Sequence, residues 1–170
     1  MEDIFKRSEF LFERFDKYIE SVNTKGIVYV TINTFFIGAF ITSLNGLAEK
    51  FQIAEVTGLF IGLFLVCCFL SIFIALLAIN PFLSSGTRFG QHPSIFYYGS
   101  IPDFDRQGFQ YRLEHISEAE LKADLSIQLH CLAEALKKKY WKLQWAGRLV
   151  IAEFALLIPI IILLALNIKK

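Results

Sequence analysis

The chain has 170 residues, of which 55% are hydrophobic and 19% are charged, and its mean hydropathy is +0.49. This composition argues against a single water-soluble domain. The formal net charge of +1 excludes neither an anionic nor a cationic partner. Three cysteines are too few for a disulfide scaffold, and we expect Cys67, Cys68 and Cys131 to remain reduced.

Residues 1–25 form the first predicted element, a cytosolic amphipathic helix. Apolar side chains such as Ile4, Leu11 and Val22 recur on one face at helical spacing. The segment carries six acids against five bases, whereas a helix that lies on a membrane surface usually has an excess of lysine and arginine. This balance favours packing against another helix. No apolar signal-peptide core precedes residue 26, so we expect the first span to direct insertion.

Residues 26–47 are the first predicted transmembrane helix, long enough to cross a hydrocarbon core of about 30 Å. An asparagine inside lipid is expensive unless a neighbouring helix or water satisfies it. Asn33 therefore indicates either a pore lining or helix contact, or a position near the end of the span.

Residues 56–80 are the second predicted transmembrane helix, which returns antiparallel after a short connection. Gly58 and Gly62 have the small-xxx-small spacing that lets membrane helices approach closely. Asn80-Pro81 ends this helix, because the residue before a proline is pushed out of the α region.

Residues 81–116 are the least regular part of the chain, since glycines and prolines interrupt them repeatedly. We expect a short strand or an extended segment at residues 94–98 and a short helix at residues 107–115. Arginines bind phosphate through charged hydrogen bonds, and tyrosines offer rings on which a base stacks. The candidate residues for binding an anionic nucleotide are Arg88, His92, Tyr97, Tyr98, Arg106 and Arg112.

Residues 117–148 are predicted to form a cytosolic helix that continues into the third transmembrane helix, residues 149–167. Ser117 and Glu120 have the spacing of a capping box at its start. Residues 137–145, which we call the basic-aromatic collar, combine lysines with tryptophans, as is typical where a helix passes from water into lipid. No glycine-proline break separates the two halves, so we expect one long helix.

Glu153 lies about one turn inside the third span, and Pro159 lies in its middle, where a proline can kink a helix. A carboxylate at this depth either lines an ion path, where it favours cations, or reaches back to the interface. In the second case its partner would be Arg148 or Trp145. The candidate pore or gating residues are thus Asn33 and Glu153.

The distribution of lysine and arginine predicts the orientation. With a cytoplasmic N-terminus and three crossings, 14 bases lie on the inner side and 3 on the outer side, as the positive-inside rule favours. The predicted fold is an all-α, multi-pass integral membrane protein. It has three transmembrane helices, an N-terminal amphipathic helix, and a cytosolic helical extension continuous with the third span.

Catalytic and metal-binding patterns are absent from the sequence. His92, His115 and His130 are widely separated, with no cysteine or carboxylate in register to complete a metal site. The sequence contains neither a glycine-rich phosphate loop after a strand nor a nucleophile elbow. We therefore expect no enzyme activity, no catalytic residue, no metal site and no cofactor.

Short motifs spread over nearly the whole chain resemble those of the Pycsar transmembrane effector family. Asn23-Thr24-Lys25, with Asn33 inside the first span, is similar to the family's "DTKA…N" opening, although Asn23 replaces the usual Asp and Gly26 the usual Ala. Phe96-Tyr97-Tyr98-Gly99 resembles the "FFG" segment that follows the second span. The other matching positions are Phe109, Asp124, Gln128 and the Lys139-Tyr140 pair before the third span.

The resemblance implies a bacterial anti-phage effector of the inner membrane, with a co-encoded cyclase or related nucleotidyltransferase as its partner. Its ligand would be a nucleotide second messenger, either a cyclic pyrimidine mononucleotide or another nucleotidyltransferase product. Infection would raise this messenger, and membrane damage would cause growth arrest or cell death.

Three spans cannot enclose a pore alone, so a pore in the lipid bilayer requires a homo-oligomer, a tetramer or a larger ring. The alternative is a non-conducting membrane scaffold that recruits a cytosolic partner through its amphipathic helices. The scaffold explains the amphipathic faces equally well, but it leaves the polar groups inside the spans without a role.

Overall fold

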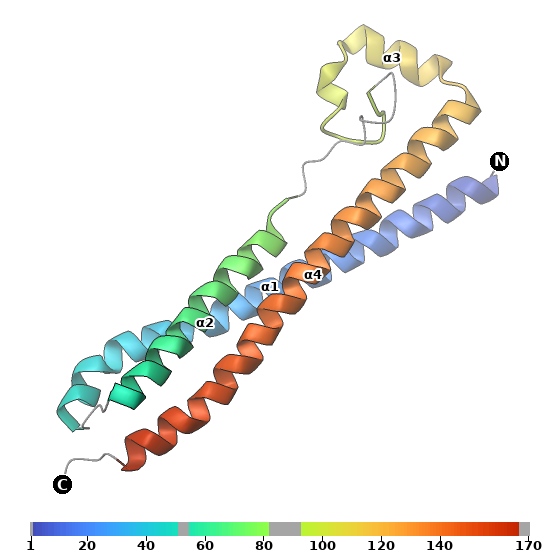
Figure 1. The fold of residues 1–170 in the computed structure, drawn as a ribbon. Coiled ribbons are helices and arrows are strands. Elements are labelled where there is room, and N and C mark those ends of the chain that lie inside the picture. Colours follow the sequence, from blue (N-terminus) through green and yellow to red (C-terminus); the bar gives the residue numbers. More distant parts are fainter. Residues whose placement is uncertain (1, 51–54, 82–92, 167–170) are drawn as a thin grey trace. The chain divides into compact units, whose positions relative to one another are not determined.

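The computed structural model describes residues 2–50, 55–81 and 93–166. Every regular element in these ranges is helical, and three of the helices are long and apolar enough to cross a membrane. The prediction of an all-α membrane protein with three spans is confirmed. The elements are α1 (Glu2–Lys50), α2 (Glu55–Ile79), the short 3-10 helix η2 (Ile101–Asp103), α3 (Arg106–His115) and α4 (Glu118–Leu166) (Figure 1).

α1 is a single helix that contains residues 2–25 of the predicted amphipathic segment and the whole of the predicted first span. Its 49 residues include no proline, so no backbone hydrogen bond is lost along it. The side chains change from mixed charged and apolar to largely apolar near residue 26. The amphipathic segment and the apolar span are thus parts of the same continuous helix.

Local sequence signals set the ends of α2 and α3. α2 ends at Ile79, directly before Asn80-Pro81, as predicted. α3 covers the predicted short helix, and Asp105 is its N-cap, with Oδ1 accepting a hydrogen bond from the Gly108 amide at 2.9 Å. Residues 95 and 96 form a bend and residues 98–100 form a turn, so the strand among our two expectations for residues 94–98 is wrong.

α4 runs unbroken from Glu118 to Leu166, so the predicted single helix through the basic-aromatic collar is confirmed. The capping box closes its first turn: the Ser117 amide donates to Glu120 Oε2 at 3.1 Å, and the Glu120 amide donates to Ser117 Oγ at 3.3 Å. Pro159 lies within the helix and does not end it.

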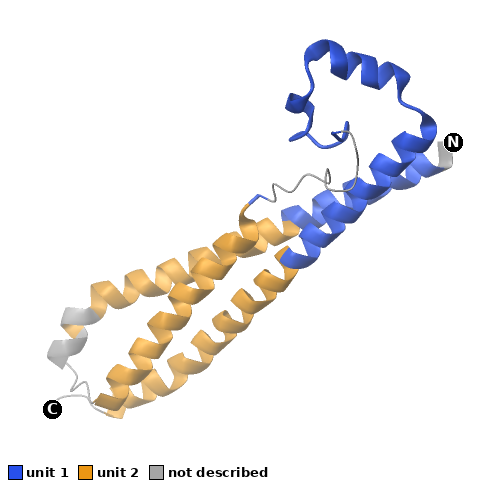
Figure 2. Cartoon of the chain, turned by 45° about the horizontal axis from the view of Figure 1, so that its top comes forward, with its two compact units in different colours: residues 1–20, 81–138 blue, residues 21–80, 139–170 orange. Residues whose placement is uncertain are grey.

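Two compact units divide the chain (Figure 2). One consists of residues 1–20 and 81–138, and we call it the head unit. The other consists of residues 21–80 and 139–170, and we call it the membrane unit because it contains the apolar parts of α1, α2 and α4.

Aromatic side chains fill the centre of the membrane unit. The ring of Phe64 in α2 lies 5.6 Å from that of Phe36 and 5.0 Å from that of Phe40, both in α1. Phe36 also meets Phe154 of α4 at 5.5 Å, so this cluster joins all three helices. The outer surface of the unit is apolar as well, which lipid tolerates and water does not. Among its exposed side chains are Phe35, Leu59, Phe73 and Ile151.

Close approach between these helices depends on glycines other than the predicted pair. A Cβ added at Gly58 or Gly62 would meet no described residue within 4 Å, so neither glycine is needed for a contact between the described helices of one chain. A Cβ at Gly147 would lie 2.9 Å from the Tyr29 hydroxyl oxygen, and one at Gly26 would lie 2.8 Å from the Ile79 side chain. Gly26 and Gly147 therefore let α1 lie close to α2 and α4.

Candidate functional site

The head unit gathers polar side chains around one face of α4. Glu120, Asp124 and Gln128 follow one another at four-residue spacing, so they lie on the same side of the helix. Asp124 Oδ2 accepts a hydrogen bond from the Ile95 amide at 3.0 Å, which fixes the loop after residue 93 against α4. This contact gives a physical role to Asp124, one of the positions that carry the family resemblance.

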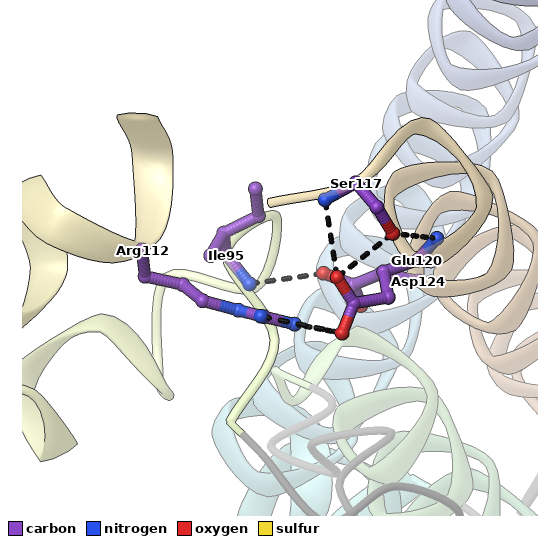
Figure 3. Close-up of polar contacts among 5 residues, drawn as sticks. All are labelled: Ile95, Arg112, Ser117, Glu120 and Asp124. Carbon is purple, nitrogen blue, oxygen red and sulfur yellow. Dashed lines mark hydrogen bonds and ion pairs between the residues drawn. The ribbon is translucent and has the colours of Figure 1, made fainter. Parts of the chain in front are cut away.

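Arg112 of α3 reaches the same face of α4 (Figure 3). Its two terminal nitrogens donate to Glu120 Oε1 at 3.3 and 3.4 Å, next to the capping box that Glu120 forms with Ser117. Hydrogen bonds from Ser117, together with the nearby Arg112 guanidinium, hold the pKa of Glu120 below its usual range. The distances are long for an ion pair that must stay closed, so an anion can compete for Arg112.

The two predicted stacking residues lie side by side in the loop that Asp124 anchors. The rings of Tyr97 and Tyr98 are 5.0 Å apart and tilted by 49°. Tyr97 is half-buried, and burial, with a contribution from Tyr98, raises the pKa of its hydroxyl. Tyr98 is 65% exposed, so one ring of the pair remains open to a ligand. A Cβ at Gly99 would collide with the Tyr97 ring, which accounts for the glycine after the tyrosines.

Three buried polar atoms of the head unit have no hydrogen-bond partner among the described residues. They are Ser100 Oγ, Gln128 Nε2 and Arg112 Nε. Ser100 is fully buried and Gln128 is 7% exposed. A buried donor or acceptor without a partner costs about 1–3 kcal/mol, so most such groups in proteins are satisfied. The described residues of the head unit therefore leave these three polar atoms without hydrogen bonds.

The structure places the six predicted ligand residues in different surroundings or does not describe them. Tyr97 and Tyr98 lie together, and Arg112 lies against Glu120. Arg106 is exposed in the first turn of α3, where the positive end of the helix dipole adds to its charge. Arg88 and His92 lie outside the described residues. The sequence patterns did not single out Ser100, whereas Gln128 appeared only through the family motif.

The two predicted pore or gating residues lie inside the membrane unit, and both are fully buried. Asn33 Nδ2 donates to Ser71 Oγ at 3.0 Å and to the Tyr29 carbonyl at 2.9 Å. Ser71 Oγ in turn donates to the Ala146 carbonyl at 3.2 Å. This chain of hydrogen bonds joins α1, α2 and α4, and it makes Asn33 a helix contact within one chain.

Glu153 is buried without a hydrogen-bond partner for either carboxylate oxygen in the part of the chain that the structure describes. The alternative in which Glu153 pairs with Arg148 or Trp145 is therefore wrong, and those two side chains contact each other instead, with Arg148 over the Trp145 ring at 4.8 Å. Glu153 is thus fully buried in α4 with no hydrogen bond or ion pair from the described residues to hold its carboxylate.

One further polar contact in the membrane unit escaped the sequence patterns. Lys139 is 7% exposed, and its ammonium donates three hydrogen bonds to main-chain carbonyls at the end of α2. The sequence placed Lys139 in the basic-aromatic collar and in a family motif with Tyr140, but neither pattern predicted its contact with α2.

Comparison with known proteins agrees with these features. Residues 7–167 match the family model described as the Pycsar effector protein domain, so the match covers nearly the whole chain. No curated protein matches the chain, and no solved structure does.

Proposed function

Because this chain belongs to the Pycsar effector protein family, we propose that a nucleotide second messenger binds its head unit and switches it to a membrane-damaging state. Family membership makes the chain a membrane effector of anti-phage defence and implies a co-encoded cyclase that makes a nucleotide signal. The family is one of effectors and is not a known enzyme family.

The main support for a ligand site in the head unit is that buried polar atoms of Ser100, Gln128 and Arg112 have no partner among the described residues. A nucleobase presents donors and acceptors along one edge, which such groups can satisfy. The cyclic phosphate binds arginine, and the exposed ring of Tyr98 stacks on the base. The ligand in this proposal is a cyclic pyrimidine mononucleotide or another nucleotidyltransferase product.

Arg112 links binding to a change in the head unit. Its ion pair with Glu120 joins α3 to the first turn of α4. A bound phosphate draws Arg112 away from Glu120, so the liganded and unliganded states differ in the position of α3. A ligand shifts such an equilibrium only through a difference in affinity for the two states.

Membrane damage in this proposal comes from a homo-oligomer in the bacterial inner membrane, a tetramer or larger, with the N-terminus in the cytoplasm. Among the described residues, the three helices of one chain pack around an apolar cluster that includes Ile61, Phe64 and Ile160. A pore therefore forms between subunits. Asn33 and Glu153 face the interior of one bundle, so they reach a pore only when the bundle rearranges.

Ligand binding is tested with purified protein in detergent, titrated calorimetrically with cyclic UMP, cyclic CMP, cyclic AMP and cyclic GMP. Removing an unsatisfied hydroxyl leaves the fold intact, so S100A should melt like the unmodified protein. We expect S100A to bind the preferred nucleotide with a Kd at least tenfold higher, which corresponds to a loss of about 1.4 kcal/mol in binding free energy. S126A is the matched control, because Ser126 Oγ is exposed and donates to its own helix. Equal affinities for S100A and S126A would contradict the site.

Permeabilisation is tested in liposomes that contain the protein and a trapped dye. Addition of the nucleotide that binds should release the dye, and S126A should release it at the same concentration. S100A should need at least ten times more nucleotide. A non-conducting scaffold releases no dye with any nucleotide, so that result would favour the scaffold over the pore.

A further inference from the structure

The C-terminal end of α2 is capped by a side chain from α4. The ammonium of Lys139 donates to the carbonyls of Ala78, Ile79 and Asn80 at 2.7, 3.0 and 2.8 Å. Lys142 adds a hydrogen bond to the Leu77 carbonyl at 3.2 Å. These are four consecutive carbonyls at a helix end, the groups that a helix leaves without partners of its own.

The contact is specific for a lysine. An ammonium has three donors, and Lys139 uses two on the last carbonyls of α2 and the third on the carbonyl of Asn80, the next residue. The negative end of the α2 dipole also attracts its charge. The side chain is 7% exposed, and in the described residues its hydrogen bonds go to main-chain carbonyls alone. We call this contact the Lys139 clamp.

The clamp lies where the chain changes units. The membrane unit ends at Asn80 on α2 and resumes at Lys139 on α4, and the residues between them belong to the head unit. The Lys139 clamp therefore joins the point where the chain leaves the membrane unit to the point where it returns. Pro81 follows immediately and cannot continue α2.

We infer that Lys139 is the positioning residue through which movement of residues 81–138 is passed to the membrane helices. The clamp ties the end of α2 to α4, so a displacement of the segment after Asn80 moves both helices together. Without the Lys139 clamp, the segment after Asn80 would move without α4, and its displacement would not reach the membrane helices. The clamp stays closed during activation. This inference rests on the proposed function, because it needs a nucleotide signal from the head unit.

The experiment compares nucleotide binding and dye release for K139M and the unmodified protein. Methionine keeps the apolar length of the side chain and removes the ammonium. K137M is the matched control, because it removes a charge from the same collar at an exposed position two residues away. Cyclic UMP, cyclic CMP, cyclic AMP and cyclic GMP serve as probes, with calorimetry for binding and dye-loaded liposomes for release.

We expect K139M to bind the nucleotide with an affinity within threefold of the unmodified protein and to release dye at least tenfold more slowly. K137M should match the unmodified protein in both measurements. If Lys139 only stabilised the fold, K139M would lower both nucleotide binding and dye release. If K139M does not insert into the membrane, K139Q takes its place, since glutamine retains a donor group without the charge, and the same loss of release is expected.

Three results would overturn the inference. Normal release by K139M would show that the clamp transmits nothing. Release by K139M without nucleotide would show that the Lys139 clamp keeps the protein inactive and must break on activation, whereas the inference requires that it stays intact. No release by the unmodified protein with any nucleotide would remove the proposed function, and the inference with it.

Discussion

Single residues matter most in this protein where a polar group is buried, because lipid and apolar side chains supply no hydrogen bonds. Asn33 and Glu153 look alike in the sequence, since each is a polar residue in an apolar run. The structure separates them. Asn33 has partners in its own helix and in α2, whereas neither carboxylate oxygen of Glu153 has one among the described residues.

Asn33 should stabilise the membrane unit measurably. We expect N33A to lower the free energy of unfolding by about 1 kcal/mol, the scale of side-chain hydrogen bonds between membrane helices. The measurement is SDS-induced unfolding in mixed micelles. T31A is the control, because Thr31 is exposed and its hydroxyl donates to the Ile27 carbonyl of the same helix. A loss in T31A as large as that in N33A would contradict this role.

At the scale of elements, helix ends and helix contacts follow different rules. The positions at which helices begin and end depend on residues adjacent in the sequence, such as Asn80-Pro81 at α2 and Ser117 at α4. The contacts depend on which residues meet across the bundle. The small-xxx-small pair in α2 shows the difference, because Gly58 and Gly62 face away from the other helices of the same chain.

The first turn of α4 should loosen in acid. The folded-state pKa of Glu120 is lowered, so its stabilising effect is present above the unfolded pKa of about 4.3 and is lost as the pH falls through the lower folded value. Amide hydrogen exchange, corrected for its intrinsic pH dependence, should therefore show less protection of residues 120–122 below this range. E120Q should remove the pH dependence, while E118Q should keep it. Unchanged protection in the unmodified protein would argue against the capping box.

Gly147 should tolerate a methyl group less well than Gly58. A Cβ at Gly147 meets the Tyr29 hydroxyl, whereas one at Gly58 points into open space. Overpacking costs about 1–3 kcal/mol, and we expect G147A near the lower end because the tyrosine ring can swing aside. G58A should leave the stability of the isolated chain unchanged, again by SDS-induced unfolding. If G58A instead disperses an oligomer, Gly58 lies between subunits.

At the scale of the whole molecule, the two units divide the proposed tasks. The head unit holds the candidate ligand groups, and the membrane unit holds three apolar helices tied together by Asn33, Ser71 and Lys139. The chain passes between the units three times, at residues 20, 80 and 138. Two of these passages lie within unbroken helices, α1 and α4.

Ion selectivity tests whether the membrane unit rearranges when the effector acts. Glu153 is buried in the bundle of one chain, so it influences ions only after the helices move apart. If they do, E153Q should lower the preference for potassium over chloride, because a carboxylate in a water-filled path favours cations. The reversal potential across a planar bilayer measures this preference. An unchanged potential would keep Glu153 out of the ion path.

The sequence by itself determined the three spans, the long uninterrupted α4, the end of α2 and the cap of α4, because each depends on hydrogen bonds or side-chain periods within one segment. It also proposed Tyr97, Tyr98, Arg106 and Arg112 as nucleotide-binding candidates, from their residue types. All six candidate ligand residues stay predictions, and two of them, Arg88 and His92, lie outside the described residues.

Only the tertiary structure decided which polar residues face inward and what they meet. Burial of Ser100, the bond from Ile95 to Asp124 and the Lys139 clamp all join or enclose segments far apart in the sequence. Local patterns do not encode such partners, since a lysine beside a membrane span reads the same whether it meets water, lipid headgroups or the carbonyls of a neighbouring helix.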